Sequence, residues 1–249
     1  MKRLILLLAV MASQPAPSLF AEDFSENLLA RWTFNKPGDD ALIDDIKKFP
    51  LELAALPGAD IELKRNEDGT ITLGPEQFLV APDINSDQYP ELRTGVTIWV
   101  RMRIDKADTQ HTSLLYGLFA KPRGDWADAA LAINLRPEGM PGPGMQLFGR
   151  FNDEKEIGQG ADLFPDHLGE FFTSALSFDS AKQGITLKVN ERQLTNKRDG
   201  AVELAPFTNL SLGRASLGGG EVTVTLDEVR IYSVPVGQEW VDEIEPVKP

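Results

Sequence analysis

The sequence predicts an all-β protein built as a two-sheet antiparallel β-sandwich. About ten to thirteen short segments have the period-2 alternation, or the β-branched and aromatic composition, that is typical of strands. Turn signals separate these segments, and the chain contains 21 glycines and 17 prolines. Helical periodicity is nearly absent, and 249 residues suit one large sandwich.

The first 21 residues have the organisation of a secretory signal peptide. Two basic residues follow the initial methionine, the apolar run Leu4–Ala12 comes next, and a small-residue segment ends at Ala21. The apolar run is shorter than the ~20 residues that span a bilayer. We therefore expect an exported protein, periplasmic or secreted. Cleavage is expected after Ala21 or, alternatively, after Ser18, and residues 22–249 are expected to form one domain.

Cysteine content and charge exclude several classes of partner. The chain has no cysteine, so a disulfide framework and lipid attachment through an N-terminal cysteine are both excluded. The formal net charge is −13, and removal of the signal peptide takes away two basic residues and no acid, which makes it −15. Nucleic acids and anionic membranes need a basic footprint on their partner, so the charge argues against both. Beyond the signal, no apolar run is long enough for membrane insertion.

The first strand-like segment after the signal is Ala30–Asn35, which carries its two aromatic residues on one face. We assign Trp32 of this segment to the core. The mixed segment Leu42–Leu56 fits either a short helix or a loop followed by a strand. Gly69–Pro82 is predicted to be a β-hairpin that turns at Gly74-Pro75 and pairs its apolar residues across the turn.

The middle of the chain supplies the predicted central strands. Gly95–Ile104 alternates, with aliphatic side chains on one face and Trp99 and two arginines on the other. The other strands predicted here, of which the first two are apolar on both faces, are Ser113–Phe119, Ala129–Leu135 and Met145–Phe151. Lys121–Asp128 is expected to be a loop with Trp126 at its tip.

Three further strands are predicted after the middle of the chain. Glu170–Phe178 and Gly184–Val189 flank a short turn, and Leu210–Gly213 is a short strand. The pair Asn190-Glu191 follows the second of these strands. A type I′ turn would need a positive φ at both residues, and glutamate serves poorly there. We therefore expect a longer turn, running to Gln193.

The strongest strand signal in the chain is Glu221–Tyr232, which is rich in valine, threonine and isoleucine. Its apolar residues occupy one face before Asp227–Glu228 and the other face after that pair. Either a β-bulge at the pair or a strand covered on both faces would explain the change of phase. A short terminal helix is expected at Gln238–Ile244.

Several motifs also point to a known family. The motif L-D-E-V-R-I-Y followed by V-P-V-G-Q-E-W-V-D-E-I, the segment A-R-W-T-F-N, and the pair E-F-F-T-S-A-L-S-F and G-I-T-L-K-V resemble segments of one fold family. That family is the laminin-G-like domains of the concanavalin A-like lectin–glucanase jelly rolls. The resemblance runs from Leu29 to Ile244 and implies a jelly roll with a short C-terminal helix.

Residues suited to catalysis are sparse. The chain has no cysteine, two histidines (His111 and His167) and no G-x-S-x-G motif. Related jelly-roll glycosidases carry E-x-D-x-E on one strand, where alternation places the carboxylates on one face. That motif is absent, and the nearest acidic cluster, Asp153–Glu156, falls in a turn. We favour a protein without catalytic activity. The alternative is a polysaccharide hydrolase or lyase with a non-standard carboxylate pair.

The resemblance also implies a calcium site. In related jelly rolls, calcium is held by the aspartate of the last strand and by an acidic residue near the first strand. Asp227 matches the former and Asp44 roughly matches the latter. Calcium prefers six to eight oxygen ligands. The alternative is that Asp227 accepts hydrogen bonds from backbone amides or pairs with an arginine.

Aromatic and basic residues outline a candidate ligand-binding groove. Sugar rings stack on flat aromatic faces, while charged and polar side chains bond the hydroxyl groups. Trp99 beside its two arginines, Trp126, and Arg150 on the outward face of its strand are the candidates. The alternative for Trp99 is burial under a loop, and the alternative for Trp126 is a role as a loop anchor.

These observations together predict an exported, non-catalytic recognition module. The expected partner is a glycan or an envelope or extracellular protein, bound through the loops and one sheet face. A further alternative is a structural module of a larger surface complex that has no small ligand. Calcium is the cofactor that the resemblance suggests.

Overall fold

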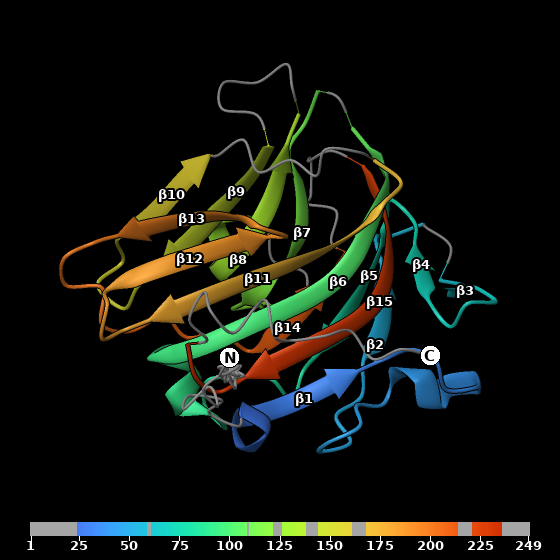
Figure 1. The fold of residues 1–249 in the computed structure, drawn as a ribbon, viewed down its shortest axis with the longest axis horizontal. Coiled ribbons are helices and arrows are strands. Elements are labelled where there is room, and N and C mark those ends of the chain that lie inside the picture. The colour runs from blue at the N-terminus through green and yellow to red at the C-terminus, as the bar shows by residue number, and fades with distance from the viewer. Residues whose placement is uncertain are drawn as a thin grey trace, which may run out of the picture.

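Two antiparallel β-sheets lie face to face in the computed structural model, which confirms the predicted all-β sandwich (Figure 1). The structure describes residues 24–58, 61–108, 110–121, 126–137, 144–160, 168–213 and 221–235. The predicted signal peptide (1–21) and terminal helix (238–244) lie outside these residues. The helices within the described ranges are the short 3₁₀ segments η1 (Phe24–Asn27), η2 (Gly38–Leu42), η3 (Pro90–Arg93) and η4 (Trp126–Asp128). None of them has the length or apolar character of a membrane span.

One sheet has eight strands in the order β13-β12-β11-β6-β15-β4-β3, with β1 as a further neighbour of β15. Its strands are β1 (Leu28–Trp32), β3 (Lys64–Arg65), β4 (Ile71–Leu73), β6 (Gly95–Ala107), β11 (Phe171–Asp179), β12 (Gly184–Val189), β13 (Arg192–Lys197) and β15 (Val222–Tyr232). In Figure 1 this eight-stranded sheet lies in front.

The other sheet has seven strands in the order β10-β9-β8-β7-β14-β5-β2. Its strands are β2 (Glu52–Ala55), β5 (Gln77–Ala81), β7 (Ser113–Phe119), β8 (Ala129–Arg136), β9 (Gly144–Arg150), β10 (Glu156–Gly160) and β14 (Asn209–Leu212). The central strands predicted from the sequence are therefore confirmed as β6 to β9, with β6 in the eight-stranded sheet and the others in the seven-stranded sheet.

The predicted hairpin at 69–82 is wrong, because its two strands belong to different sheets. β4 pairs with β15 and β3, whereas β5 pairs with β14 and β2. The Gly74-Pro75 turn thus carries the chain from one sheet to the other. Leu73 and Leu79 are both fully buried in the main core, so the apolar residues of the two strands meet across the sandwich.

The longer turn expected at Asn190-Glu191 is also wrong. Val189 pairs directly with Arg192, so β12 and β13 are joined by a two-residue turn. Asn190 has a φ of 48°, and Glu191 is not among the residues with positive φ. Turns with a positive φ at the first central residue alone are compatible with a hairpin, and asparagine tolerates that conformation.

The predicted change of phase in β15 is a β-bulge. The register with β6 shifts between Leu226 and Glu228, which leaves Asp227 as the extra residue. Val224 before the bulge and Val229 after it are both fully buried in the main core. The bulge also divides the other edge of β15, because β4 pairs before it and β1 pairs after it.

The start of the described chain anchors the sandwich through Trp32, which is fully buried as predicted. The first strand ends at this residue, and Phe34 has a φ of 58°, so the chain turns away earlier than the predicted end at Asn35. In the mixed segment 42–56, the loop-and-strand alternative applies: Ile43 forms an isolated bridge with Pro50, and β2 follows.

Two smaller apolar clusters are separate from the main core. Trp99, Ala175 and Tyr232 form one cluster on strands of the eight-stranded sheet. The other, on strands of the seven-stranded sheet, consists of Leu114, Phe119, Ala129, Ala132 and Phe148. Because the alternate residues of these strands fill the main core, both clusters lie on outward sheet faces.

Candidate functional site

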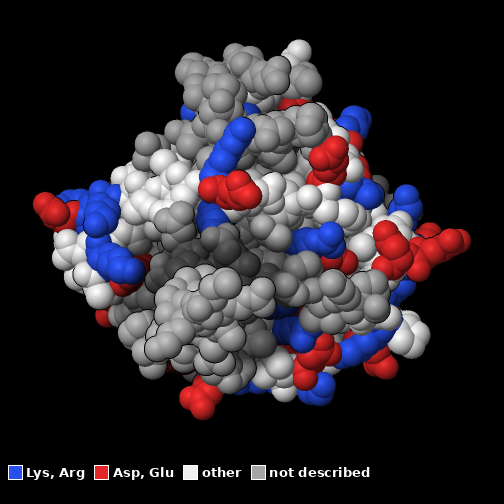
Figure 2. Space-filling view, in the orientation of Figure 1, with Lys and Arg blue, Asp and Glu red and all other residues white. Residues whose placement is uncertain are grey.

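The outward face of the eight-stranded sheet gathers arginines from three neighbouring strands. β6 alternates as predicted, with its aliphatic side chains in the core and Trp99, Arg101 and Arg103 on the other face. Strand pairing places Arg230 of β15 opposite Trp99, and Arg31 of β1 opposite Arg230. We call Arg31, Arg101, Arg103 and Arg230 the arginine face. Figure 2 views the molecule from the side of this sheet and shows basic and acidic side chains interspersed.

Glu228 holds two members of the arginine face together. Its side chain is 2% exposed, and its Oε1 accepts hydrogen bonds from Nε of Arg31 at 2.8 Å and from Nε of Arg230 at 2.7 Å. A buried carboxylate needs such pairing to offset its desolvation. Burial alone lowers the pKa of Arg230, but hydrogen bonds to Glu228 and Tyr232 outweigh burial and raise that pKa above its usual value. Arg230 therefore stays charged.

The bulge residue Asp227 fixes the position of Arg101. The Arg101 guanidinium forms an ion pair with Asp227, so the alternative in which this aspartate pairs with an arginine describes the structure. Arg103 pairs with Asp105 through Nε at 2.5 Å. Cζ of Arg101 lies 4.7 Å, and Cζ of Arg103 lies 4.9 Å, from the ring centroid of Phe171. Both guanidinium groups thus contact one aromatic ring in cation–π geometry.

The arginine face carries unused hydrogen-bond donors. A guanidinium has five N–H donors, yet within the described ranges Arg31 donates only through Nε, and Arg101 only through Nη1. The side chains of Arg31, Arg101 and Arg103 are 24%, 30% and 30% exposed. Their donors are therefore partly open to a ligand.

The arginine face also differs in charge from the rest of the chain. Its four arginines are paired with three carboxylates, those of Asp105, Asp227 and Glu228. Within this named group the arginines outnumber the carboxylates by one, in a chain whose net charge is −13. The alternation of β6 indicates Arg101 and Arg103 from the sequence. Arg31 and Arg230 could not be predicted, because only the pairing of β1 with β15 brings them into the group.

Trp99 lies on this face but is fully buried. Cζ of Arg230 is 4.9 Å from the centroid of its ring, and Ala175 and Tyr232 pack against it. Its Nε1 is buried and has no hydrogen-bond partner in the described structure. The ring is therefore not an open stacking surface in this conformation, and the N–H is a donor without an acceptor.

Arg150 and Trp126 belong to the other sheet. Arg150 ends β9 and pairs with Glu156 of β10 through Nε at 3.0 Å and Nη2 at 2.6 Å. It also donates to the carbonyl oxygen of Ala127, in the short helix η4 that begins at Trp126. The side chain of Trp126 lies outside what the structure describes. The structure thus brings the backbone at Trp126 near Arg150 and separates both from Trp99.

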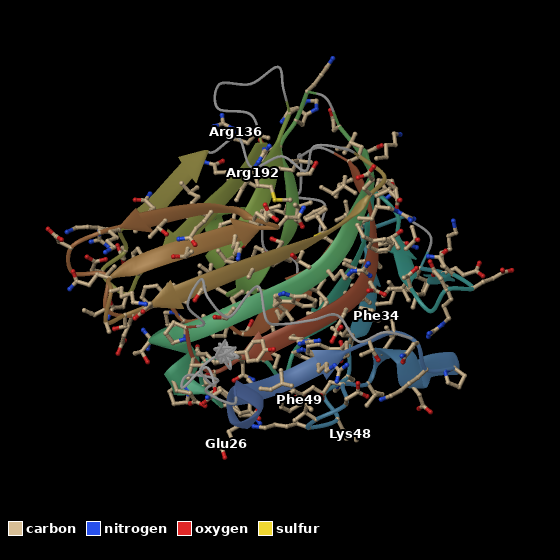
Figure 3. The ribbon with its side chains drawn as sticks, in the orientation of Figure 1. Glu26, Phe34, Lys48, Phe49, Arg136 and Arg192 are labelled. Carbon is tan, nitrogen blue, oxygen red and sulfur yellow. The ribbon has the colours of Figure 1, made fainter. Side chains whose placement is uncertain are left out.

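Asp44 is fully buried and is surrounded by backbone amides. Its Oδ1 accepts hydrogen bonds from the amides of Ile46 at 2.6 Å and Lys47 at 3.0 Å, and its Oδ2 accepts one from the amide of Phe49. Lys48 has a φ of 67°, which lets the loop wrap around the carboxylate. Figure 3 labels Lys48 and Phe49 at the end of the molecule that carries β1.

The two predicted metal ligands already have protein partners. Asp44 accepts three amide hydrogen bonds, and Asp227 pairs with Arg101. Within the described ranges, no group of three or more Asp, Glu, His or Cys side chains is arranged to hold a metal ion. Calcium needs more oxygen ligands than this arrangement supplies. The described residues do not fit a calcium site, and calcium binding stays a prediction.

Of the acidic cluster Asp153–Glu156, Asp153 to Lys155 lie in the turn between β9 and β10, as expected, whereas Glu156 is the first residue of β10. Asp153 accepts hydrogen bonds from Arg198, which is the main reason that its pKa is lowered to about 2. His111, one of the two histidines considered for catalysis, is exposed, and its Nδ1 lies 3.1 Å from Oδ2 of Asp108. His167 lies outside the described residues. A hydrolase or lyase with another carboxylate pair stays a prediction.

Comparison with known proteins gives a likeness of fold. No protein-family model matches the chain, and no curated protein matches it. The binding domain of botulinum neurotoxin DC in complex with rat synaptotagmin II has a TM-score of 0.62 at 9% identity, over 88% of this chain and 51% of that chain. The serotype D ligand-binding domain in complex with N-acetylneuraminic acid has a TM-score of 0.62 at 10% identity, over 88% and 50% of the two chains.

A third similar structure is the receptor-binding domain of the C/D mosaic neurotoxin, with a TM-score of 0.64 at 11% identity, over 88% of this chain and 51% of that chain. A likeness of structure at such low sequence identity establishes the fold and not the activity. The chain spans about half the length of these structures. They support a β-sandwich of the jelly-roll kind, and membership of the laminin-G-like family stays a prediction.

Proposed function

We propose that the mature chain is an exported, laminin-G-like recognition module that binds a glycan through the arginine face. The observation that carries the proposal is that Arg31 and Arg101 are partly exposed and keep spare donors, while Arg101 and Arg103 lie over the ring of Phe171. Glycan recognition combines directional hydrogen bonds with contact to an aromatic face. Carboxylate partners already orient these arginines, so less side-chain entropy is lost when a ligand binds.

The similar structures support recognition as the class of function. One is described in complex with N-acetylneuraminic acid, and another in complex with synaptotagmin II. This chain matches only about half of each, so their ligands are an analogy of fold and class. An envelope or extracellular protein is the second partner class that this analogy allows.

The test is a binding measurement with the mature protein, residues 22–249. We would screen a diverse glycan array and then measure the affinity of any bound glycan by isothermal titration calorimetry. We expect Arg101→Gln to weaken binding by about tenfold or more, because a charge-assisted hydrogen bond contributes about 1.5–3 kcal/mol.

Arg150→Gln is the matched control, since Arg150 also has a carboxylate partner but lies on the other sheet. Equal losses of affinity in the two variants, or no loss in R101Q, would show that the glycan binds elsewhere. If no glycan on the array binds, the glycan proposal is contradicted and a protein is the remaining partner class.

Export is tested separately. N-terminal sequencing of the protein recovered from periplasmic and culture-medium fractions would show whether cleavage follows Ala21 or Ser18. Recovery of the uncleaved chain from the cytoplasm alone would contradict export.

A further inference from the structure

The arginine face presents mostly hydrogen-bond donors, and this asymmetry defines the chemical group that it can bind. We infer that it binds an oxyanion, the carboxylate or sulfate group of an acidic sugar, between Arg31 and Arg101. The inference rests on the proposed glycan-binding function and names the group that the glycan must carry.

Arg31 and Arg101 lie on either side of Glu228. Strand pairing places Arg101 opposite Glu228, and Nε of Arg31 is 2.8 Å from Oε1 of Glu228. Residues directly opposite in antiparallel strands have Cβ atoms about 4.5–5.5 Å apart. The two arginines therefore come from the strands on either side of Glu228, and each keeps N–H donors that no described residue uses.

The carboxylates around this position already pair with arginines. Glu228 is 2% exposed and accepts from two arginines, and Asp227 is paired with Arg101. A sugar hydroxyl group both donates and accepts, whereas a carboxylate or sulfate group only accepts and can bond a guanidinium in a bidentate manner. The donors of Arg31 and Arg101 therefore match an oxyanion better than a neutral hydroxyl group.

Local and overall charge act in opposite directions on such a ligand. The arginines of the arginine face outnumber their three named carboxylate partners by one, while the whole chain has a net charge of −13. Salt screens the long-range repulsion, over a Debye length of about 8 Å at physiological ionic strength, and weakens partly buried contacts less. Affinity should therefore change little with salt, unlike the steep loss seen when a basic surface releases counterions from a polyanion.

Trp99 provides a reporter for this site. Arg230 lies over its ring and shares Oε1 of Glu228 with Arg31. A ligand that accepts hydrogen bonds from Arg31 brings a negative charge close to Glu228 and Arg230. This charge changes the electric field at the indole of Trp99. We expect tryptophan emission to change on binding, and Trp99→Phe to remove that change while it preserves affinity.

The experiment compares charged and neutral forms of the same sugar chain. The mature protein is titrated with an oligogalacturonate and its methyl-esterified form, and in parallel with dextran sulfate and dextran, by calorimetry and fluorescence. We expect at least one charged member to bind about tenfold or more tightly than its neutral partner. The pair that shows the preference distinguishes a carboxylate ligand from a sulfate ligand.

Variants test which arginines cause the preference for the charged sugar chain. Arg31→Gln and Arg101→Gln should abolish it, and Arg150→Gln should retain it. Arg31→Lys is the second test at that position, because it keeps the charge and loses the bidentate donor pair. Thermal unfolding of each variant verifies that it is folded.

Two results would overturn the inference. One is equal or absent binding of the charged and neutral members of both pairs. The other is a preference that survives in R31Q and R101Q. In either case, a neutral glycan from the array that depends on Arg101 would still support the proposed function, so the two failures are distinguishable.

Discussion

The outward face of the eight-stranded sheet carries the arginine face and its three carboxylate partners, whereas the outward face of the seven-stranded sheet carries a buried apolar cluster. On the first face, the side chains of Arg101 and Arg103 are each 30% exposed. On the second, Phe119 is fully buried and Phe148 is 2% exposed. The two faces of one sandwich thus differ in the groups that they offer to a partner.

The difference follows from how the strands are buried. β7 is buried at every position, whereas β6 alternates beyond Val100. Small apolar clusters outside a main core are typical of surfaces that lie under other segments of the chain. We therefore expect the seven-stranded face to contribute to stability and the arginine face to contribute to binding.

The largest effect is expected from the centre of the arginine face. Glu228→Ala leaves Arg31 and Arg230 without their shared carboxylate, and breaking a buried ion pair costs about 3–5 kcal/mol. We expect a loss of that order in the free energy of unfolding, measured by urea denaturation.

The matched control is Glu156→Ala, which removes the partner of Arg150 on the other sheet. Glu156 is 47% exposed, so the expected loss is below about 1 kcal/mol. Similar losses in the two variants would show that the two faces do not differ in the burial of their charges.

The next effect concerns the apolar face. Phe148→Ala removes a ring that is 2% exposed, and truncation of a buried phenylalanine costs about 3 kcal/mol or more. Phe171→Ala, on the partly exposed arginine face, should cost about 1 kcal/mol but weaken glycan binding. Urea denaturation measures the loss of stability in both variants, and calorimetry measures their loss of glycan affinity. A greater loss of stability in F171A than in F148A would contradict it.

A smaller difference in stability is expected between substitutions of two buried tryptophans. Trp32 donates its indole N–H to the carbonyl oxygen of Phe49 at 3.2 Å, whereas Nε1 of Trp99 has no partner in the described structure. Trp32→Phe should lower the free energy of unfolding by about 2 kcal/mol, because it removes a buried hydrogen bond and leaves a small cavity. Trp99→Phe removes an unsatisfied donor and should change it by less than about 1 kcal/mol. Equal losses in urea denaturation would mean that Trp99 has a partner in solution.

Local patterns in the sequence were sufficient for most of the fold. Alternation identified β6, and the change of phase in β15 marked Asp227–Glu228, where the structure selects the bulge over a strand covered on both faces. The error at 69–82 arose because a turn inside one sheet and a turn between two sheets carry the same residues. Only the pairing of β4 with β15 and of β5 with β14 distinguishes them, and such long-range pairing is not encoded in a short segment.

The site was harder to predict because strand register decides it. Arg31 and Glu228 are far apart in the sequence and meet only through the pairing of β1 with β15. Asp44 showed the opposite problem. Its partners are three amides within the next five residues, so its structural role is local, yet an aspartate that caps a loop and one that binds a metal look alike in sequence.

The smallest predicted effect lies where the two sheets meet. Asp153 follows β9 of the seven-stranded sheet, and Arg198 follows β13 of the eight-stranded sheet, so their ion pair joins the two. Hydrogen bonds from Arg198 lower the pKa of Asp153 to about 2, below the ordinary value of about 3.9. A lowered folded-state pKa means that this carboxylate stabilises the fold above about pH 4, and that the contribution is lost as the pH falls towards 2.

Asp153→Asn should therefore flatten the dependence of stability on pH between about 4 and 2, with a slight loss of stability at neutral pH. Urea denaturation at several pH values in this window measures the slope. Glu154→Gln, at the exposed neighbouring position, should leave the slope unchanged. An identical slope in D153N and the parent would show that the carboxylate is not paired in solution. The contact between the two sheets would then depend on their apolar core and on buried hydrogen bonds such as that between Tyr116 and Ser174.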